Sequence, residues 1–287
     1  MKPDTEMRLL TPSDLEFAES LRQIAGWNQT YEDWQAFLGY DPNGCFMAEW
    51  LGMRAGTATT TCYGTALAWV GMVLVHPQYR GRGIGRALLK HCLEHLSERR
   101  IRCVKLDATP FGKPLYQQLG FEHEWPLDRW ETTSLDLRED SGSLPIKPIN
   151  IAEMEALADF DAKGFGVPRK GMLARLASRS ARSFTYFSAS GQIEGYGFLR
   201  EGALASYLGP VVADSRDIAR ALILRLLAHR TRQKVYWDIP NPNSAAVSLA
   251  KEFRFTQQRA LFRMFRGTNE NPGDPQRQFA IADPATG

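Results

Sequence analysis

Hydrophobic and polar positions change period along the chain, which predicts strands and helices in mixed order. Segments of strand length occur at 45–50, 57–63, 68–75 and 103–107, and 68–75 is an apolar run. Apolar residues at helical spacing predict helices at 12–25, 30–38 and 83–98, and a further helix that ends at Gly120. Thr30 with Asp33 three residues later predicts a capping box. The order of elements predicts an α/β (α+β) fold.

The pattern occurs twice. Residues 7–15 and 146–154 share the layout of a short strand, a cap and a helix start, and the segments 115–121 and 249–255 end the two halves alike. The copies are about 135 to 140 residues apart. A polar stretch with Gly and Pro separates them and predicts a linker. The predicted organisation is a first domain at 1–137, a linker at 138–145, a second domain at 146–267 and a C-terminal tail at 268–287.

Composition excludes several classes of protein. The 287 residues are 44% hydrophobic and 23% charged, which is typical of a globular chain and excludes a largely disordered one. No apolar run reaches the length of a membrane span, and no secretory signal opens the chain, so we expect no membrane partner and a cytoplasmic location. Four scattered cysteines, without a Cys/His cluster, predict no metal site.

Charge differs between the halves. Residues 1–140 hold 15 basic and 19 acidic side chains (−4), and the remainder holds 20 and 13 (+7), which together give the net charge of +3. An acidic first half would suit a cationic acceptor. The arginines of the second half are dispersed, so nucleic-acid binding is not expected.

The segment 73–89 carries the chemistry. A buried strand leads into a turn with Gly81, Gly83 and Gly85, and an amphipathic helix starts inside that turn. Glycines let the backbone approach a ligand, and the free N–H groups and dipole of a helix start attract a pyrophosphate. The basic side chains here can add charge-assisted contacts; they are Arg80, Arg82 and Arg86. The spacing fits neither a P-loop nor a Rossmann fingerprint. The structural alternative is a glycine-rich turn that only reverses the chain.

The pattern Arg80-x-x-Gly83-x-Gly85, after an apolar strand and Val75-x-Pro77, resembles the acetyl-CoA signature of the GNAT superfamily of N-acyltransferases. The resemblance extends over 1–137 and includes the Leu-Tyr-x-x-Leu-Gly-Phe ending at 115–121. It implies two tandem GNAT-like modules, each a mixed, mostly antiparallel central sheet flanked by helices.

The resemblance also implies site residues, with acetyl-CoA as the co-substrate. Main-chain groups of Val73 and Val75 would bind the pantetheine arm. The pyrophosphate would be held by the segment Arg80, Gly81, Arg82, Gly83, Ile84, Gly85 and Arg86. Tyr116 occupies the place of the tyrosine that protonates the departing thiolate, and the alternative for it is a packed core residue. Thr109 stands where the family commonly has an Asn that contacts the cofactor.

The general base is not assigned. Many relatives place a Glu near the start of the fourth strand, but residues 68–72 hold no ionisable group. The carboxylates considered by type alone are Glu49, Asp107 and Glu122; an amine can also lose its proton to water before attack. Trp27 and Asn28 lie where this fold places substrate-specificity loops, and packing against the next helix is the alternative for Trp27.

The second copy differs at the corresponding places. Its strand at 206–213 is followed by a helix start without glycine, with Asp214 and Asp217 where phosphates would lie. Ala250 replaces the tyrosine, whereas Asn243 supplies the Asn that the first copy lacks. The second module thus resembles a degenerate GNAT-like domain.

Two functions follow from this reading. The first is acetyl-CoA-dependent acetyl transfer to a primary amine by direct attack, on a small molecule or on a protein or peptide. The alternative is a non-catalytic acetyl-CoA-binding sensor or interaction protein. The acceptor, the acyl-chain preference and the oligomeric state are left open.

Overall fold

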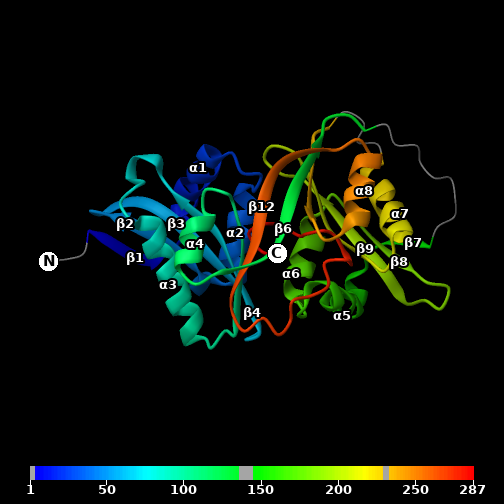
Figure 1. Ribbon diagram of the computed structural model, residues 1–287, viewed down its shortest axis with the longest axis horizontal. Helices are drawn as coiled ribbons and strands as arrows, with labels where there is room; N and C mark the ends of the chain where they lie inside the picture. Colours follow the sequence, from blue (N-terminus) through cyan, green and yellow to red (C-terminus); the bar gives the residue numbers. More distant parts are fainter. Residues whose placement is uncertain (1–3, 136–144, 229–232) are drawn as a thin grey trace. The chain divides into compact units, whose positions relative to one another are not determined.

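The computed structural model describes residues 4–135, 145–228 and 233–287 (Figure 1). The strands are β1 (Thr5–Leu9), β2 (Cys45–Trp50), β3 (Met53–Tyr63), β4 (Leu67–Val75), β5 (Cys103–Ala108), β6 (Glu122–Thr132), β7 (Ile146–Pro148), β8 (Arg182–Phe187), β9 (Ile193–Arg200), β10 (Ser206–Ala213), β11 (Val235–Pro240), β12 (Thr256–Gly267) and β13 (Gln278–Ala280). The α-helices are α1 (Leu15–Ala25), α2 (Tyr31–Tyr40), α3 (Ile84–Glu98), α4 (Lys113–Gln118), α5 (Met154–Phe165), α6 (Lys170–Arg179), α7 (Arg216–Leu227) and α8 (Ser244–Glu252). The α/β class is confirmed. The predicted linker lies outside the described residues, except for its last position.

The described residues form two compact units that are not continuous in sequence. The first contains residues 4–122, 264–270 and 284–286, and the second contains the described residues of 123–263 together with 271–283 and 287. Strand β6 therefore belongs almost wholly to the second unit, while the end of β12 belongs to the first. The sequence pattern describes each half as one block, because periodicity reports a strand but not the sheet that it joins.

The sheet of the first unit has the order β1-β2-β3-β4-β5, followed by the end of β12. Neighbours from β1 to β4 are antiparallel, and β4 and β5 are parallel. Alternate residues of a strand face opposite sides. In β2, Met47 packs with α1 and α2, whereas the ring of Phe46 meets His91 of α3 edge-on. Helices therefore cover both faces of this sheet.

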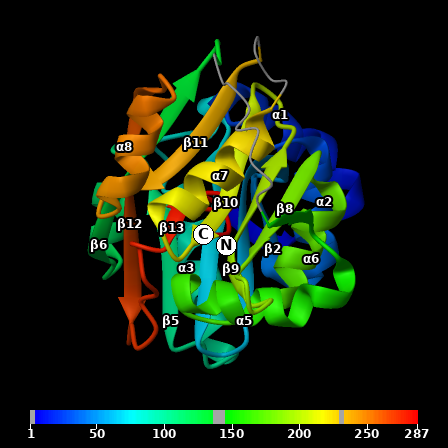
Figure 2. The ribbon, with the colours of Figure 1, turned by 90° about the vertical axis from the view of Figure 1, so that its right-hand side faces the viewer.

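The second unit is organised in the same way. Its strand order is β12-β6-β11-β10-β9-β8-β7, with β10 and β11 parallel. Helix α7 crosses β8, β9 and β10 (Figure 2). Gly197 of β9 faces Leu226 of α7, while the alternate residues Tyr196 and Phe198 pack with α5 and α6. A mixed sheet flanked by helices thus occurs in each unit, as predicted.

Helix starts follow the polar residues that the sequence places there. Thr30 Oγ1 accepts from the Asp33 N–H at 3.3 Å, and Asp33 Oδ2 accepts from the Thr30 N–H at 2.8 Å. This reciprocal pair confirms the capping box of α2. Ser215 caps α7 in a simpler way, since its hydroxyl accepts from the Ile218 N–H at 3.3 Å.

The segment predicted as a tail is an integral part of both units. It contains β13, which pairs with β10, and Phe279 is buried. Further on, Pro284 and Thr286 provide carbonyls that accept from Trp69 Nε1 at 3.1 Å and from the Tyr63 hydroxyl at 2.7 Å. Its Gly, Pro, Asn and Asp content indicates turns correctly, but the buried apolar residues between those turns give the segment a packed structure.

Candidate functional site

The end of β4 forms one side of a fork in the first unit. Strand β4 pairs with β5 only from Leu67 to Trp69, although β3 accompanies β4 to its end. No strand of the described chain pairs with the other edge of 70–75. The main-chain groups of Val73 and Val75 therefore lie on a strand with one open edge, which is where a ligand can add as an extra strand.

A β-bulge shapes this strand beside the fork. Met72 and Val73 together oppose Ala58 of β3, and Met72 has φ of 49°. The Met72 carbonyl accepts from the buried hydroxyl of Thr57 at 3.0 Å, which fixes the bulge. Bulges redirect strands next to functional sites. The sequence contains no signal for this one, because a buried Met is ordinary in any strand.

The turn after β4 supplies unpaired amide groups. Gly81 and Gly83 have φ of 76° and 79°, values that side chains with a Cβ rarely adopt. A Cβ built on either glycine would meet no protein atom within 4 Å. Gly83 is the N-cap of α3, so the N–H groups that follow it have no acceptor within the helix. The turn thus offers donors at an open, positively polarised helix start.

The three arginines of the motif contact different neighbours. Arg80 Nε donates to the Val75 carbonyl at 3.1 Å and so ties the turn to the end of β4. The Arg82 guanidinium lies 5.4 Å from the centre of the Trp50 ring. Arg86 donates to the side-chain oxygen of Gln118. All three are on or near the surface, so each can exchange its protein contact for an anion at small cost.

Tyr116 lies on α4, close to the turn. A Cβ on Gly85 would approach Val75 Cγ2 at 3.7 Å and Leu115 Cδ2 at 3.9 Å, so β4, α3 and α4 converge here. The Tyr116 ring meets Phe121 edge-on at 6.0 Å between centroids. Burial, with a smaller effect from Cys92, raises the pKa of Tyr116 to about 12. The phenol therefore keeps its proton throughout the neutral and mildly alkaline range.

The remaining predicted residues have local contacts. The Thr109 hydroxyl accepts from the Gly112 N–H at 3.2 Å, at the start of the turn that carries α4. Trp27 packs against the cluster that contains Met72, and its carbonyl accepts from Arg22 at 2.8 Å. Asn28 is buried next to it. The loop with Trp27 and Asn28 therefore belongs to the α1–α2 side of the sheet, the side on which the Met72 side chain packs.

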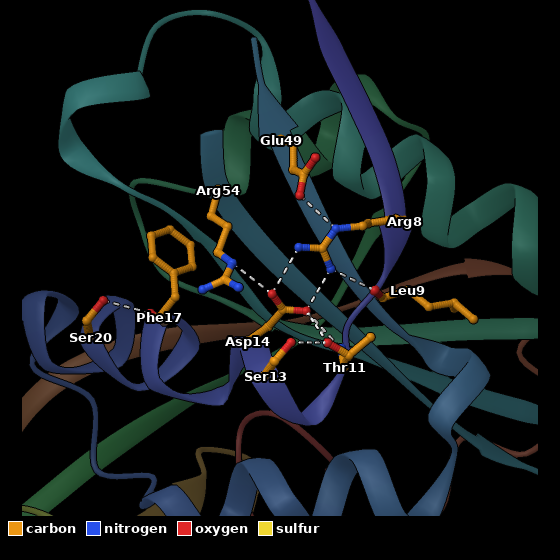
Figure 3. Close-up of polar contacts among 9 residues, drawn as sticks. All are labelled: Arg8, Leu9, Thr11, Ser13, Asp14, Phe17, Ser20, Glu49 and Arg54. Carbon is orange, nitrogen blue, oxygen red and sulfur yellow. Dashed lines mark hydrogen bonds and ion pairs between the residues drawn. The ribbon is translucent and has the colours of Figure 1, made fainter. Parts of the chain in front are cut away.

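An ion network fixes the entry to α1 (Figure 3). The buried Asp14 carboxylate accepts from Arg8 at 2.6 and 2.9 Å, and Arg54 Nε lies 2.9 Å from Asp14 Oδ1. The hydroxyl and N–H of Thr11 donate to Asp14 Oδ2 at 2.8 and 2.9 Å. These bonds hold the pKa of Asp14 well below its usual range, against the effect of burial. Glu49, a candidate base by residue type, is bound to Arg8 at 2.7 Å, which favours a structural role.

The corresponding fork in the second unit is filled by the chain itself. Strand β10 pairs with β11 from Ser206 to Leu208 and then with β13, at Val211 opposite Ala280 and Val212 opposite Gln278. Strand β13 thus takes the place beside β10 that is open beside β4. The sequence gives no signal for this arrangement, because Gln278-Phe279-Ala280 has no pattern that distinguishes it from other short segments.

Asn243 holds the segment that fills this fork. Its Nδ2 donates to the carbonyls of Pro275, Gln276 and Gln278 at 3.2, 2.9 and 3.1 Å, and its Oδ1 accepts from the Ala246 N–H at 2.9 Å. The Asn that the first unit lacks is therefore committed here to the protein's own backbone. The Asp214 carboxylate, at the start of α7, is paired with Arg277 of the same segment.

Comparison with known proteins finds the same domain twice. A family model described as an acetyltransferase (GNAT) domain matches residues 41–123, and a second model with the same description matches residues 157–280. Among solved structures, a candidate acetyltransferase from Pyrococcus horikoshii is 25% identical to this chain. The alignment covers 100% of this chain and 97% of that structure, with a TM-score of 0.84. A tandem GNAT protein from the clavulanic acid biosynthesis pathway is 15% identical, covers 92% and 98%, and has a TM-score of 0.68, which shows the fold.

Relatives in sequence have acyltransferase names. An uncharacterized N-acetyltransferase from Bacillus subtilis, YitH, is 26% identical over 179 residues, which is 62% of each chain. The match therefore leaves part of that relative uncovered. A holothin acyltransferase from a Pseudoalteromonas species is 24% identical over 260 residues, 89% of this chain and 85% of its own. A mycothiol acetyltransferase from Thermomonospora curvata is 33% identical over 108 residues, which is 37% of this chain and 36% of that relative.

Neither a metal-ion site nor a membrane-spanning helix is found in the described residues. Within residues 4–135, 145–228 and 233–287, no group of His, Cys, Asp and Glu side chains is arranged to hold a metal ion. In the same ranges, no helix combines the length and apolarity that a membrane span requires.

Proposed function

Because this chain belongs to the GNAT superfamily and carries two such domains in tandem, we propose that its first unit is an acetyl-CoA-dependent N-acetyltransferase for a primary amine. Acyl transfer from acyl-CoA is the activity of the family. One observation carries the assignment to the first unit: the open edge of β4 runs directly into the left-handed glycines and free amides at the start of α3.

The residues fit acetyl-CoA in shape and charge. Val73 and Val75 would pair with the pantetheine arm through their main-chain groups, and the amides from Gly81 to Arg86 would hold the pyrophosphate. The space that a Cβ of Gly81 or Gly83 would fill contains no protein atom, so it is available to phosphate oxygens. When bound, acetyl-CoA supplies a thioester whose carbonyl carbon accepts the amine.

We propose Tyr116 as the general acid. Its raised pKa keeps the phenol protonated, so Tyr116 can donate that proton to the sulfur as the thiolate leaves. The same buried surroundings disfavour every anion, and they also raise the pKa of the neighbouring Cys92 thiol. The CoA thiolate that leaves in these surroundings is more basic for the same reason, so it can take the proton of a weakly acidic phenol.

No base is assigned. Asp107 and Glu122 are candidates by residue type only. An amine that reaches the site in its neutral form needs no base for the attack, and the proton that its nitrogen loses as the C–N bond forms can pass to water. Trp27 and Asn28 are the proposed acceptor-side residues, because Trp27 packs next to the bulged part of β4.

The second unit, in this proposal, binds no acetyl-CoA. Strand β13 occupies the pairing edge of β10, the start of α7 has no glycine, and Ala250 stands in place of the tyrosine. The bounds 1–137 and 146–267 for the two modules and 138–145 for the linker stay predictions from the sequence, whereas 268–287, predicted as a tail, is packed into the two compact units.

The experiment is a release assay for free CoA thiol over a library of amines. Small-molecule amines come first, since relatives are named for holothin and mycothiol, and peptides with free N-termini follow. Amine-dependent release that is lost in Tyr116→Phe supports the enzyme. Tight binding of acetyl-CoA without release by any amine would instead favour the alternative, a non-catalytic sensor or interaction protein.

A further inference from the structure

One face of the second unit carries a row of charged and aromatic side chains. Asp238 of β11 lies directly opposite Arg129 of β6, and Tyr207 of β10 lies opposite Tyr236 of β11. Cross-strand partners share a face of the sheet. Arg129, Asp238, Tyr207 and Tyr236 are all buried.

Arg259 of β12 belongs to the same face. Leu261 packs with Leu127 of β6, and Arg263 lies 5.6 Å from the Trp125 ring. Since alternate residues of a strand share a face, Arg259 is next in this series and lies beside Arg129. Its side chain is half-buried, so water and small solutes still reach it.

The acceptors on this face are already used. Asp238 accepts from Arg129 Nε at 2.8 Å and from Arg129 Nη2 at 2.6 Å, and the Tyr207 hydroxyl donates to Asp238 Oδ2 at 2.9 Å. Glu131, the next acidic residue on this face of β6, lies 3.0 Å from Lys234 Nζ.

Arg200 is a further cation near this face. It donates to the Ala282 carbonyl and lies 4.0 Å from Asp283 Oδ2. An anionic partner within the unit is therefore present for Arg129, Lys234 and Arg200.

Arg259 has none. Its Nε is buried without a hydrogen-bond partner, and the described residues offer it neither an ion pair nor a ring contact. Burial and the adjacent Arg129 lower the pKa of Arg259. A guanidinium nevertheless stays protonated at neutral pH, so one uncompensated positive charge is left on a partly dehydrated surface.

We propose that Arg259 is the anchor of a carboxylate-binding site on this face of the second unit. The planar fork of a guanidinium matches the two oxygens of a carboxylate. The charges that act on Arg259 select this class of anion: its charged neighbours Arg129 and Asp238 compensate each other, which leaves the one positive charge of Arg259. A singly charged carboxylate neutralises it, whereas a doubly charged phosphate would leave a negative charge beside Asp238. The site goes beyond the proposed acetyl transfer and does not depend on it.

The test measures thermal stability in the absence of acetyl-CoA. Sodium acetate is titrated against the full chain, with sodium chloride at matched ionic strength as reference, and sodium phosphate as a separate arm. A ligand that binds only the folded state raises Tm in a saturable way. We expect acetate to raise Tm above chloride in the wild type, and phosphate to do so less.

Two substitutions at the anchor and one control locate the effect. Arg259→Gln should bind acetate at least about tenfold more weakly, because the charge and the fork are lost. Its Tm without ligand should be unchanged or higher, since an uncompensated buried charge is removed. Arg259→Lys keeps the charge but loses the fork, so we expect an intermediate shift. Arg254→Gln removes the same charge from an exposed position and should respond as the wild type does.

Several results would overturn the site. The first is a Tm shift of the wild type in acetate that is no larger than its shift in chloride. The second is a Tm shift in acetate that is as large in Arg259→Gln as in the wild type. The third is a Tm shift in acetate that is reduced as much in Arg254→Gln as in Arg259→Gln. A larger shift with phosphate than with acetate would contradict the charge count. A ligand-free Tm that falls in Arg259→Gln and Arg259→Lys alike would show that Arg259 has a structural partner after all.

Discussion

Replacing Gly83 by Ala separates the backbone role of this glycine from its role toward a ligand. The structure offers a matched control in Gly52, in the turn between β2 and β3. Gly83 and Gly52 have φ of 79° and 78°, and in both cases an added Cβ would meet no protein atom within 4 Å. An alanine in the left-handed region costs about 1–2 kcal/mol. Both variants should therefore lose the same small amount of unfolding free energy.

Only Gly83→Ala should weaken acetyl-CoA binding. A methyl group at the start of α3 would keep the pyrophosphate from at least one main-chain donor. The loss of one charge-assisted hydrogen bond, about 1.5–3 kcal/mol, raises Kd about 10- to 150-fold. Isothermal titration calorimetry gives Kd, and urea unfolding gives the stability of each variant. Equal affinities of Gly83→Ala and Gly52→Ala, with both proteins folded, would refute the assignment of the pyrophosphate cradle.

Further predictions concern chemistry, stoichiometry and stability. Tyr116→Phe should slow turnover about 10²-fold with little change in Kd for acetyl-CoA; unchanged turnover, with chemistry rate-limiting, would make Tyr116 a packing residue only. Calorimetric titration should give one acetyl-CoA per chain, and two equivalent sites would contradict the proposed role of β13. Asn243→Ala should lower the unfolding free energy by about 2–4 kcal/mol, since it removes a helix cap and the side-chain donor to the buried Gln278 carbonyl; urea unfolding within about 0.5 kcal/mol of the wild type, on the order of a surface substitution, would refute this. Asp14 has a lowered pKa in the folded state, so its contribution is present above the unfolded value of about 4 and is lost as pH falls below it. Asp14→Asn should therefore be less stable at pH 7 and lose less stability between pH 5 and pH 3 than the wild type, and parallel pH profiles would argue against this linkage.

The sequence predicts what is encoded locally. Thr30 and Asp33 specify a capping box through side chains three residues apart, and the glycines after β4 announce a turn because few other residues adopt positive φ there. The strand and helix order of the first copy follows from periodicity in the same way. These features need no knowledge of the rest of the chain.

Contacts between distant segments are not encoded in this way. The pairing of β13 with β10 joins residues more than sixty positions apart, and nothing in the three residues Gln278–Ala280 indicates the strand that they join. The uncompensated charge of Arg259 is invisible in the sequence for the same reason. It becomes apparent only when the register of β6 and β11 commits Asp238 to Arg129.

The difference between the two forks has a physical logic. A splayed strand exposes main-chain N–H and C=O groups along one edge, and burying them unpaired costs free energy. The first unit leaves the edge of β4 open beyond Trp69, so water or a strand-like ligand must satisfy it. In the second unit the corresponding glycines and tyrosine are absent, and β13 pairs with β10 instead. Asn243 fixes backbone carbonyls of the chain in this arrangement. If the second module binds no acetyl-CoA, as we propose, the C-terminal segment satisfies the main-chain edge of β10 that a strand-like ligand would otherwise pair with.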